Sequence, residues 1–344
     1  MAREPRLSER ESAENFVSVG LTAAIVATID DMPCALEVEH PSGERRAGGE
    51  TDFARSGLPF GPFDPHAHRT LESGLRMWVE EQTKLQLGYV EQLYTFGDRG
   101  RHDQDPDGGL RVLSVGYLAL TRRGEGDRAP GTRWRSWYEH FPWEDFRNGR
   151  PPLIDERLAP AFEDWLKASD RTSVDRRRDR IRQCFGFYEG PGWDEERVLE
   201  RYELLYEAGL VYESLRDRPN ASRGAAAADP RLGLPMIYDH RRILATAMGR
   251  LRAKLKYRPV IFELMPPTFT LFDLQRTVEA ISGVRIHKQN FRRLVETGGL
   301  VEQTGATIQT RGRPAQLFRF RHEVLGERPA PGVKLTSPRH TRGK

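Results

Sequence analysis

The chain has few cysteines and no long apolar run. Its 344 residues include only two cysteines, Cys34 and Cys184, which cannot build a disulfide framework or a zinc site of cysteines. The longest apolar stretch, Val19 to Ile29, is interrupted by polar residues and is far shorter than the roughly 20 residues of a membrane helix. The first residues alternate in charge and lack the apolar segment of a secretory signal. We therefore expect a cytoplasmic protein with no membrane partner.

Two common nucleotide-binding signatures are also absent. Neither G-x-x-x-x-G-K-[ST] nor G-x-G-x-x-G occurs in the sequence, which argues against P-loop and dinucleotide-binding chemistry. Charged residues are abundant, at 30% beside 38% hydrophobic residues. This composition and length predict a soluble chain with a hydrophobic core and two or more domains.

The charge is unevenly distributed along the chain. The formal net charge is only +4. Residues 241–344, however, contain 21 basic and 7 acidic side chains, a net charge of +14, so that residues 1–240 carry −10. Such an asymmetry is typical of a protein in which one part binds a polyanion and the other does not.

The N-terminal third has the pattern of a mixed α+β domain. Val17 to Ile29 and Cys34 to Val38 flank a turn signal, which predicts two strands. His68 to Leu85 has apolar residues at helical spacing and predicts a helix. Two more strands are predicted from Leu87 to Phe96 and from Leu110 to Leu120. The segment LPFGPFDP, which precedes the helix, contains three prolines and predicts a loop outside any ladder.

The middle of the chain has a weaker pattern, between about Thr121 and Gly233. One helix is predicted from Asp194 to Leu210, where apolar and aromatic residues recur at helical spacing. The stretch from Ser214 to Leu232 is rich in Pro, Ala, Arg and Asp, and it favours a mobile connection.

The C-terminal third predicts three helices followed by a hairpin. Apolar spacing defines the helices, and capping residues and glycines mark their ends. The predicted bounds are Asp239 to Lys256, Thr270 or Asp273 to Gly283, His287 to Thr297, Leu300 to Gln303 and Gln316 to Arg321. This order of elements is typical of the winged form of the helix-turn-helix.

The third of these helices and the hairpin tip carry the candidate DNA contacts. An inward apolar stripe leaves basic and amide side chains on the outer faces of the helix. Arginine can read guanine, glutamine and asparagine can pair with adenine, and lysine neutralises phosphate, while an arginine at a wing tip suits a narrow minor groove. The predicted DNA-binding residues are Lys288, Gln289, Asn290, Arg292, Arg293, Arg311 and Arg313. The alternative is a solvated helix face.

A second candidate site lies on the helix of the N-terminal domain. Glu80 and Glu81 are adjacent carboxylates on a helix that follows a Pro/Gly loop. Mg²⁺ binds one or two carboxylates and shares the phosphate oxygens of a substrate, which makes this pair a candidate metal site. The alternative is an ordinary exposed pair of glutamates.

The segment LPFGPFDPHAHRTLESGLRMWVEEQT resembles a degenerate Nudix box, whose usual pattern is G-x5-E-x7-R-E-U-x-E-E-x-G-U. Arg76 and the two glutamates occupy their expected positions. The departures are Pro62 at the opening glycine, His68 and Met77 at two glutamates, and Thr83 at the late glycine. The resemblance therefore implies a domain that binds its ligand rather than hydrolysing it, with an active ADP-ribose pyrophosphatase as the alternative.

The C-terminal block extends the resemblance. The segment DHRRILATAMGRLRAKLKYRPVIFELMPPTFTLFDLQRTVEAISGVRIHKQNFRR, with the later GRPAQLFRFR, is similar to the Nudix-related transcriptional regulators of NAD metabolism, the NrtR family. The resemblance covers about residues 17–121 and 234–321. Residues 122–233 lie outside it and are interpreted as an insertion of open role.

The resemblance implies an α+β protein with a Nudix-like α/β/α sandwich domain, residues 1–256, followed by a winged helix-turn-helix domain, residues 257–344. It implies a dimeric repressor of NAD metabolism genes that binds double-stranded promoter DNA and senses ADP-ribose or a related metabolite. No cofactor is required, and Mg²⁺ is expected only together with such a ligand. The expected effector-binding residues are Arg76, Glu80, Glu81, Phe96, Arg99 and Arg101. Phe96 or Tyr94 is expected to stack on adenine, and the alternative for both rings is core packing.

Overall fold

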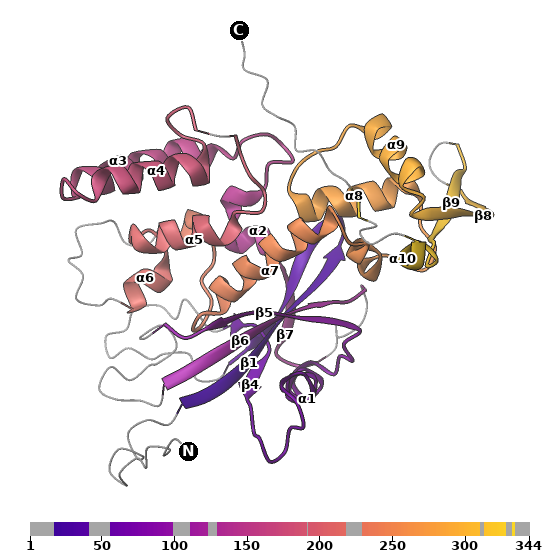
Figure 1. Ribbon diagram of the computed structural model, residues 1–344, viewed down its shortest axis with the longest axis horizontal. Coiled ribbons are helices and arrows are strands. Elements are labelled where there is room, and N and C mark those ends of the chain that lie inside the picture. The colour runs from indigo at the N-terminus through magenta and orange to yellow at the C-terminus, as the bar shows by residue number, and fades with distance from the viewer. Residues whose placement is uncertain are drawn as a thin grey trace, which may run out of the picture.

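The computed structural model describes residues 17–40, 56–98, 111–122, 129–190, 192–217, 229–309, 313–327 and 332–333. Its main feature is a mixed sheet with helices on both faces (Figure 1). No helix in these ranges is long and apolar enough to span a membrane. The strands of this sheet are β1 (Val17–Ile29), β2 (Met32–Glu39), β3 (Ser56–Gly57), β4 (Phe60–Pro62), β5 (Tyr89–Phe96), β6 (Arg111–Leu120) and β7 (Thr132–Ser136).

The long strand β1 lies at the centre of the sheet. The strand order is β3-β2-β1-β6-β5, with β4 paired to β1 and β7 paired to β2. β1 runs parallel to β6 over ten residue pairs and antiparallel to β2 through a tight turn. The four strands predicted in this third of the chain are thus confirmed, with bounds that differ by a few residues at most.

The segment predicted as a loop outside any ladder is partly a strand, and that prediction is wrong. β4 pairs antiparallel with β1. The prolines fit because each contributes only its carbonyl group: Pro59 O accepts the amide hydrogen of Ala23 at 2.9 Å, and Pro62 O accepts the indole N–H of Trp78 at 2.8 Å. Proline is tolerated where no ladder bond requires its missing N–H group.

The two faces of the sheet bury different cores. Alternate residues of β1 point to opposite sides, as expected for a strand: Leu21, Ala23 and Ile25 face the helix α1 (Leu71–Thr83), and Ala24 and Val26 face α7 (His240–Leu255). This gives the α/β/α sandwich predicted from the sequence. Because each face is covered by a helix, strands of nearly continuous apolar composition are stable at the centre of the sheet.

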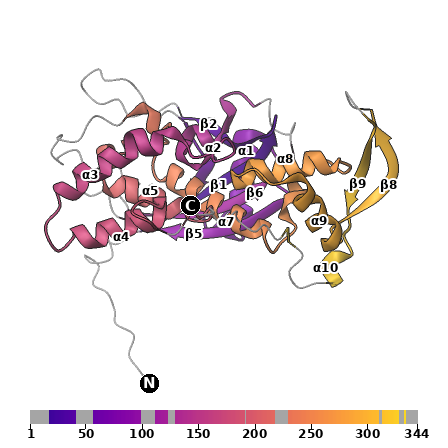
Figure 2. The same cartoon turned by 90° about the horizontal axis from the view of Figure 1, so that it is seen from above.

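Residues 129–190, 192–217 and 229–233, which were expected to belong to an insertion, form a mainly helical layer that is named the inserted layer after that expectation. β7 extends the sheet, and the helices that follow lie on the α7 side (Figures 1 and 2). These elements are α2 (Trp137–His140), the short helices η1 (Pro142–Glu144) and η2 (Ile154–Leu158), α3 (Ala159–Lys167), α4 (Val174–Phe185), α5 (Val198–Glu207), α6 (Tyr212–Asp217) and η3 (Pro230–Leu232). The predicted helix at residues 194–210 is therefore confirmed as α5.

The stretch from Ser214 to Leu232 was expected to be a mobile connection, which is wrong for its described parts. Both of its described ends are helical, and each contributes a buried side chain, Ser214 at one end and Leu232 at the other. Glu213, just before it, accepts the amide hydrogen of Met236 at 3.1 Å and pairs with Arg241 at 3.2 Å. These tertiary contacts stabilise a segment whose composition alone resembles a linker.

The C-terminal third is a winged helix domain at one end of the molecule (Figure 2). Its elements are η4 (Val260–Leu264), α8 (Leu271–Ser282), α9 (Lys288–Gly298), β8 (Val301–Ile308), β9 (Ala315–Phe320) and α10 (Val324–Glu327). β8 extends five residues further than predicted, past a register shift at Gly305, whose φ is +81°. Left-handed backbone of this kind favours glycine.

Helix α7 connects the two domains. It contacts β1, β5 and β6 of the sheet, α5 of the inserted layer, and α8 and η4 of the winged helix. The buried side chains of the winged helix and of α7 form one continuous cluster. Asp239, predicted to cap α7, is its N-cap residue but makes no capping hydrogen bond with its side chain.

Candidate DNA-binding and effector sites

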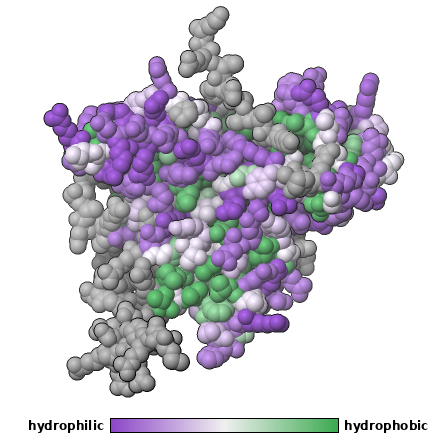
Figure 3. Space-filling view, in the orientation of Figure 1, coloured by the Kyte–Doolittle hydropathy of each residue, from purple (hydrophilic) through white to green (hydrophobic). Residues whose placement is uncertain are grey.

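Helix α9 presents a polar face to solvent. Its buried residues are Phe291 and Val295, both fully enclosed, and they hold α9 against the rest of the domain. The predicted base and phosphate contacts lie on the opposite faces. All five of them are exposed: Lys288, Gln289, Asn290, Arg292 and Arg293. Figure 3 shows a mainly hydrophilic surface along the outer edge of the winged helix.

The basic side chains of α9 have no acidic partners among the described residues. No ion pair involving Lys288, Arg292 or Arg293 occurs within these ranges, whereas many arginines of the body are paired, as Arg201 is with Glu144. An unpaired guanidinium at an exposed position retains its full capacity to neutralise phosphate. The helix therefore has the geometry and the charge that contact with duplex DNA requires.

The wing is the antiparallel pair β8 and β9. Arg313 is exposed and lies two residues before β9. Arg311 lies outside the described residues. At its base, Phe320 stacks on Phe262 of η4 with ring centroids 4.3 Å apart. The hairpin is thus fixed to the domain by aromatic packing.

Helix α1 carries the Nudix-like residues. Thr70 and Ser73 form a capping box at its start. The guanidinium of Arg76 bonds the carbonyl oxygens of Leu87 and Gly88 and pairs with Glu72 at 2.8 Å. The side chain of Arg76 therefore holds the start of β5 to α1, which commits most of its donors to the fold.

The candidate metal ligands Glu80 and Glu81 are both exposed on α1. Within the described ranges, no group of three or more His, Cys, Asp or Glu residues is arranged to hold a metal ion. A hydrolytic Nudix site needs several carboxylates around its metal, and the residue Met77 at one of those positions is exposed and apolar. The metal site remains a prediction.

The other departures from the box fill structural positions. His68 is 6% exposed, and its Nδ1 accepts the amide hydrogen of Asp64 at 3.0 Å. Thr83 is fully buried and donates its hydroxyl to the carbonyl of Val79 at 2.7 Å. Trp78, which donates to Pro62, occupies the space beside Gly61. The hydrogen bonds and packing of these residues stabilise the segment that resembles the Nudix box.

The two candidate stacking rings differ in burial. Phe96 is 2% exposed, belongs to the core, and lies beneath the guanidinium of Arg242, 4.9 Å from its ring centroid. This burial favours the alternative of core packing for Phe96, and its role in binding a base stays a prediction. Tyr94 is 60% exposed and keeps the stacking role open. Arg99 and Arg101 lie outside the described residues.

A cavity of about 810 Å³ lies between the end of the sheet and the winged helix. Aromatic rings and charged side chains of both signs line this cavity, and none of the predicted effector residues does. Its principal lining residues are Tyr89, Arg122, Lys254, Arg258, Phe262 and Phe320. Sequence reasoning missed this junction, because its residues come from five separate segments without a shared motif.

Comparison with known proteins agrees with this architecture. Residues 261–320 match the family model of the NrtR DNA-binding winged helix domain. The ADPR responsive transcriptional repressor NtrR of Acinetobacter baylyi is 42% identical over 119 residues, which are 34% of this chain and 48% of that protein. The match thus spans about half the length of this curated relative.

Two solved structures of NrtR from Shewanella oneidensis have a similar fold. The structure with a 27mer DNA has a TM-score of 0.50 at 20% identity, covering 90% of this chain and 95% of that chain. A second structure of that protein has a TM-score of 0.50 at 19% identity, covering 89% and 95%. The predicted α+β fold with a C-terminal winged helix-turn-helix domain is therefore confirmed. Because these structures cover about nine tenths of this chain, most of residues 122–233 has a counterpart in that fold, and the interpretation of this stretch as an insertion is wrong.

Proposed function

We propose that this chain, whose C-terminal domain matches the NrtR DNA-binding winged helix, is a transcriptional repressor controlled by ADP-ribose or a related metabolite of NAD. The observation that carries the proposal is the exposed basic face of α9, which has no acidic partner among the described residues. The names of the relatives support it: one is an ADPR responsive repressor, and another was solved with DNA.

The proposed DNA contacts follow from the geometry of α9 and the wing. The exposed face of α9 enters the major groove, where Arg292 and Arg293 read guanine or hold phosphate, and Gln289 and Asn290 read adenine. Arg313 reaches the neighbouring minor groove from the wing. In a homodimer, two copies of α9 contact half-sites about 34–36 Å apart, in promoters of NAD metabolism genes.

The proposed effector site is the Nudix-like domain. The exposed Glu80 and Glu81 accept Mg²⁺ only together with the diphosphate of the ligand, and Tyr94 offers an exposed ring for a base. His68 and Met77 replace two carboxylates of the box, so we propose that the ligand is bound and not consumed. A ligand that prefers one arrangement of the two domains then shifts the DNA-binding equilibrium by its differential affinity.

The first test measures binding to a duplex taken from the region upstream of the protein's own gene, by fluorescence anisotropy at moderate salt. We expect the double substitution Arg292→Ala and Arg293→Ala to weaken binding at least about tenfold. The matched control is Arg176→Ala with Arg182→Ala, two exposed arginines of α4 in the inserted layer. Unchanged affinity of the α9 variant, or an equal loss in both, would refute the assignment of α9.

The second half of the test adds ADP-ribose, NAD or ATP to the wild-type complex. We expect ADP-ribose to change the affinity for DNA while remaining intact in the presence of Mg²⁺. Sustained release of AMP would instead favour the alternative, an ADP-ribose pyrophosphatase with an accessory basic domain.

A further inference from the structure

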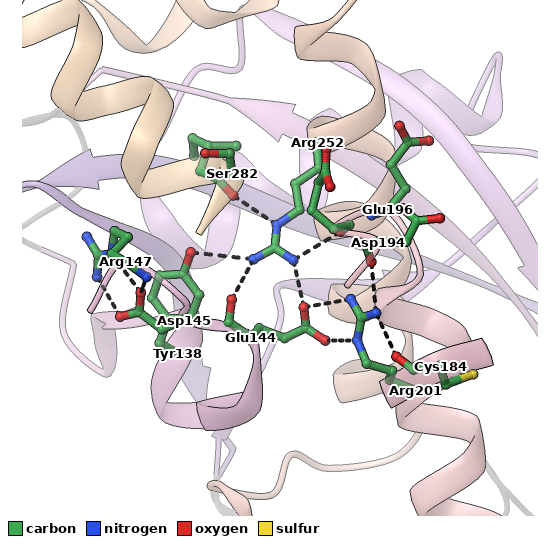
Figure 4. A network of polar contacts seen from close by, with 12 residues as sticks. Tyr138, Glu144, Asp145, Arg147, Cys184, Asp194, Glu196, Arg201, Arg252 and Ser282 are labelled. Carbon is green, nitrogen blue, oxygen red and sulfur yellow. Dashed lines mark hydrogen bonds and ion pairs between the residues drawn. The ribbon is translucent and has the colours of Figure 1, made fainter. Parts of the chain in front are cut away.

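The inserted layer contributes a fully buried carboxylate, Glu144 at the end of η1, which two guanidinium groups share (Figure 4). Arg201 of α5 binds both carboxylate oxygens, at 2.6 and 2.9 Å. Arg252 of α7 binds one of them at 2.6 Å. All three side chains have no exposed surface, so the cluster encloses one negative and two positive charges away from water.

Backbone carbonyl oxygens accept the hydrogen bonds of the two guanidinium groups that Glu144 does not accept. Arg201 donates to the carbonyl oxygen of Asp194 at 2.8 Å and stacks on Trp193, with the guanidinium 3.7 Å from the ring centroid. Arg252 donates to the carbonyl oxygen of Glu195 at 3.1 Å. A buried charge is tolerated only where such partners surround it. The cluster is therefore a complete hydrogen-bonded unit rather than a chance contact of charged side chains.

The same unit binds the C-terminal end of α8, the first helix of the helix-turn-helix. Arg252 Nε donates to the carbonyl oxygen of Ile281 at 2.9 Å, and the hydroxyl of Tyr138 donates to that of Ala280 at 2.7 Å. The amide of Phe146 donates to the carbonyl oxygen of Gly283 at 2.8 Å. The last carbonyl groups of a helix have no partners within the helix, and here the rest of the protein provides them.

At Gly283 the end of α8 packs closely against the inserted layer. Its φ is +75°, and a Cβ atom there would lie 2.6 Å from the carbonyl oxygen of Glu144 and 2.9 Å from Arg252 Nη2. Helix α9 begins five residues after Gly283. The end of α8 is thus the point from which the turn to the recognition helix starts, and it rests directly on residues of the inserted layer.

We propose that the inserted layer, through Glu144 and Tyr138 and together with Arg252 of α7, sets the position of α9 for DNA binding. These are positioning residues, since none of them lies on the exposed face of α9. They act on α9, and the partner that α9 binds is the duplex DNA of the proposed function. The inference rests on that function for one readout only, because the order of α9 can be measured without DNA.

The test compares two conservative substitutions in the full chain, Arg252→Lys and Arg201→Lys. Both shorten a fully buried arginine bound to Glu144, but only Arg252 contacts α8. We expect Arg252→Lys to weaken DNA affinity about tenfold, which corresponds to about 1.4 kcal/mol. We also expect it to speed amide hydrogen exchange in residues 283–291. Arg201→Lys should leave both measurements within about twofold of the wild type at a similar loss of thermal stability.

A milder pair guards against loss of folding. Tyr138→Phe removes only the hydroxyl that bonds Ala280, and Tyr206→Phe removes a hydroxyl that bonds Asp217 within the inserted layer at 2.9 Å. Faster exchange in residues 283–291 for Tyr138→Phe, but not for Tyr206→Phe, supports the proposal. Equal effects of the two members in both pairs would overturn it. Wild-type protein that fails to bind the duplex would refute the proposed function and leave the exchange test intact.

Discussion

At the scale of single residues, the ionisation of Glu37 on β2 is closely tied to the fold. It is 1% exposed, yet it lies 2.6 Å from His140 Nε2 and accepts a hydrogen bond from the hydroxyl of Ser56 at 2.7 Å. Burial raises the pKa of this carboxyl, but His140, Ser56 and Arg135 outweigh it and lower the pKa to about 2. The ionised form is therefore strongly favoured in the folded state.

This lowered pKa predicts an acid dependence of stability. Because the folded pKa of about 2 lies below the ordinary value of 4.5, ionised Glu37 stabilises the fold fully above about pH 4.5 and loses this effect as the pH falls toward 2. We expect Glu37→Gln to lower the free energy of unfolding at pH 7 by about 3 kcal/mol and to flatten its pH dependence below pH 4.5. Urea unfolding at several pH values measures both effects.

The control for this substitution is Glu39→Gln, an exposed residue of the same strand. It should change neither the free energy of unfolding nor its slope with pH. Equal slopes for wild-type protein and Glu37→Gln would show that other carboxyls account for the acid dependence.

At the scale of elements, the start of α8 has a reciprocal cap. The hydroxyl oxygen of Thr270 accepts the amide hydrogen of Asp273 at 3.1 Å, and the carboxylate of Asp273 accepts that of Thr270 at 3.0 Å. We expect Thr270→Ala to lower the free energy of unfolding by about 1 kcal/mol and to weaken DNA binding as the helix frays. Thr70→Ala removes the equivalent cap of α1, so it should cost similar stability and leave DNA binding unchanged.

Local sequence signals predicted most of these elements. Periodicity and caps located α1, α7, α8 and α9 within three residues of their observed ends, because such signals lie within one or two turns of the chain. The strand β4 was missed, since its ladder depends on β1, which lies some forty residues away. The sequence could not show that Phe96 is buried and Tyr94 exposed, because an aromatic residue on a strand is compatible with either environment.

The charged cluster at the domain junction left no signal in the sequence. Glu144, Arg201 and Arg252 are separated by more than fifty residues each, and each resembles an ordinary surface charge in its local segment. Only the packing of η1, α5 and α7 brings them together. The role of residues 122–233 was left open for this reason: their composition predicts surface and linker, whereas many of the described residues in this range belong to the core.

At the scale of the whole molecule, the winged helix and the sandwich share one apolar cluster that continues through α7. Domains with separate cores unfold independently, whereas a shared core couples them. We expect calorimetry of the full chain to show a single unfolding transition, in which the winged helix and the sandwich unfold together. Two resolved transitions, with Arg252→Lys affecting only one of them, would contradict this view.

The glycine at the end of α8 has a consequence for the exchange of winged helix domains between proteins. The carbonyl of Glu144 leaves no space for a side chain at Gly283, so the winged helix and the inserted layer fit closely at this point. A chimaera that joins this winged helix to the sandwich of another protein would expose the carbonyl ends of α8 unless that sandwich offered the same contacts as Tyr138, Phe146 and Arg252. Exchange of DNA specificity between such proteins should therefore proceed by changes on the face of α9, and not by transfer of the whole domain.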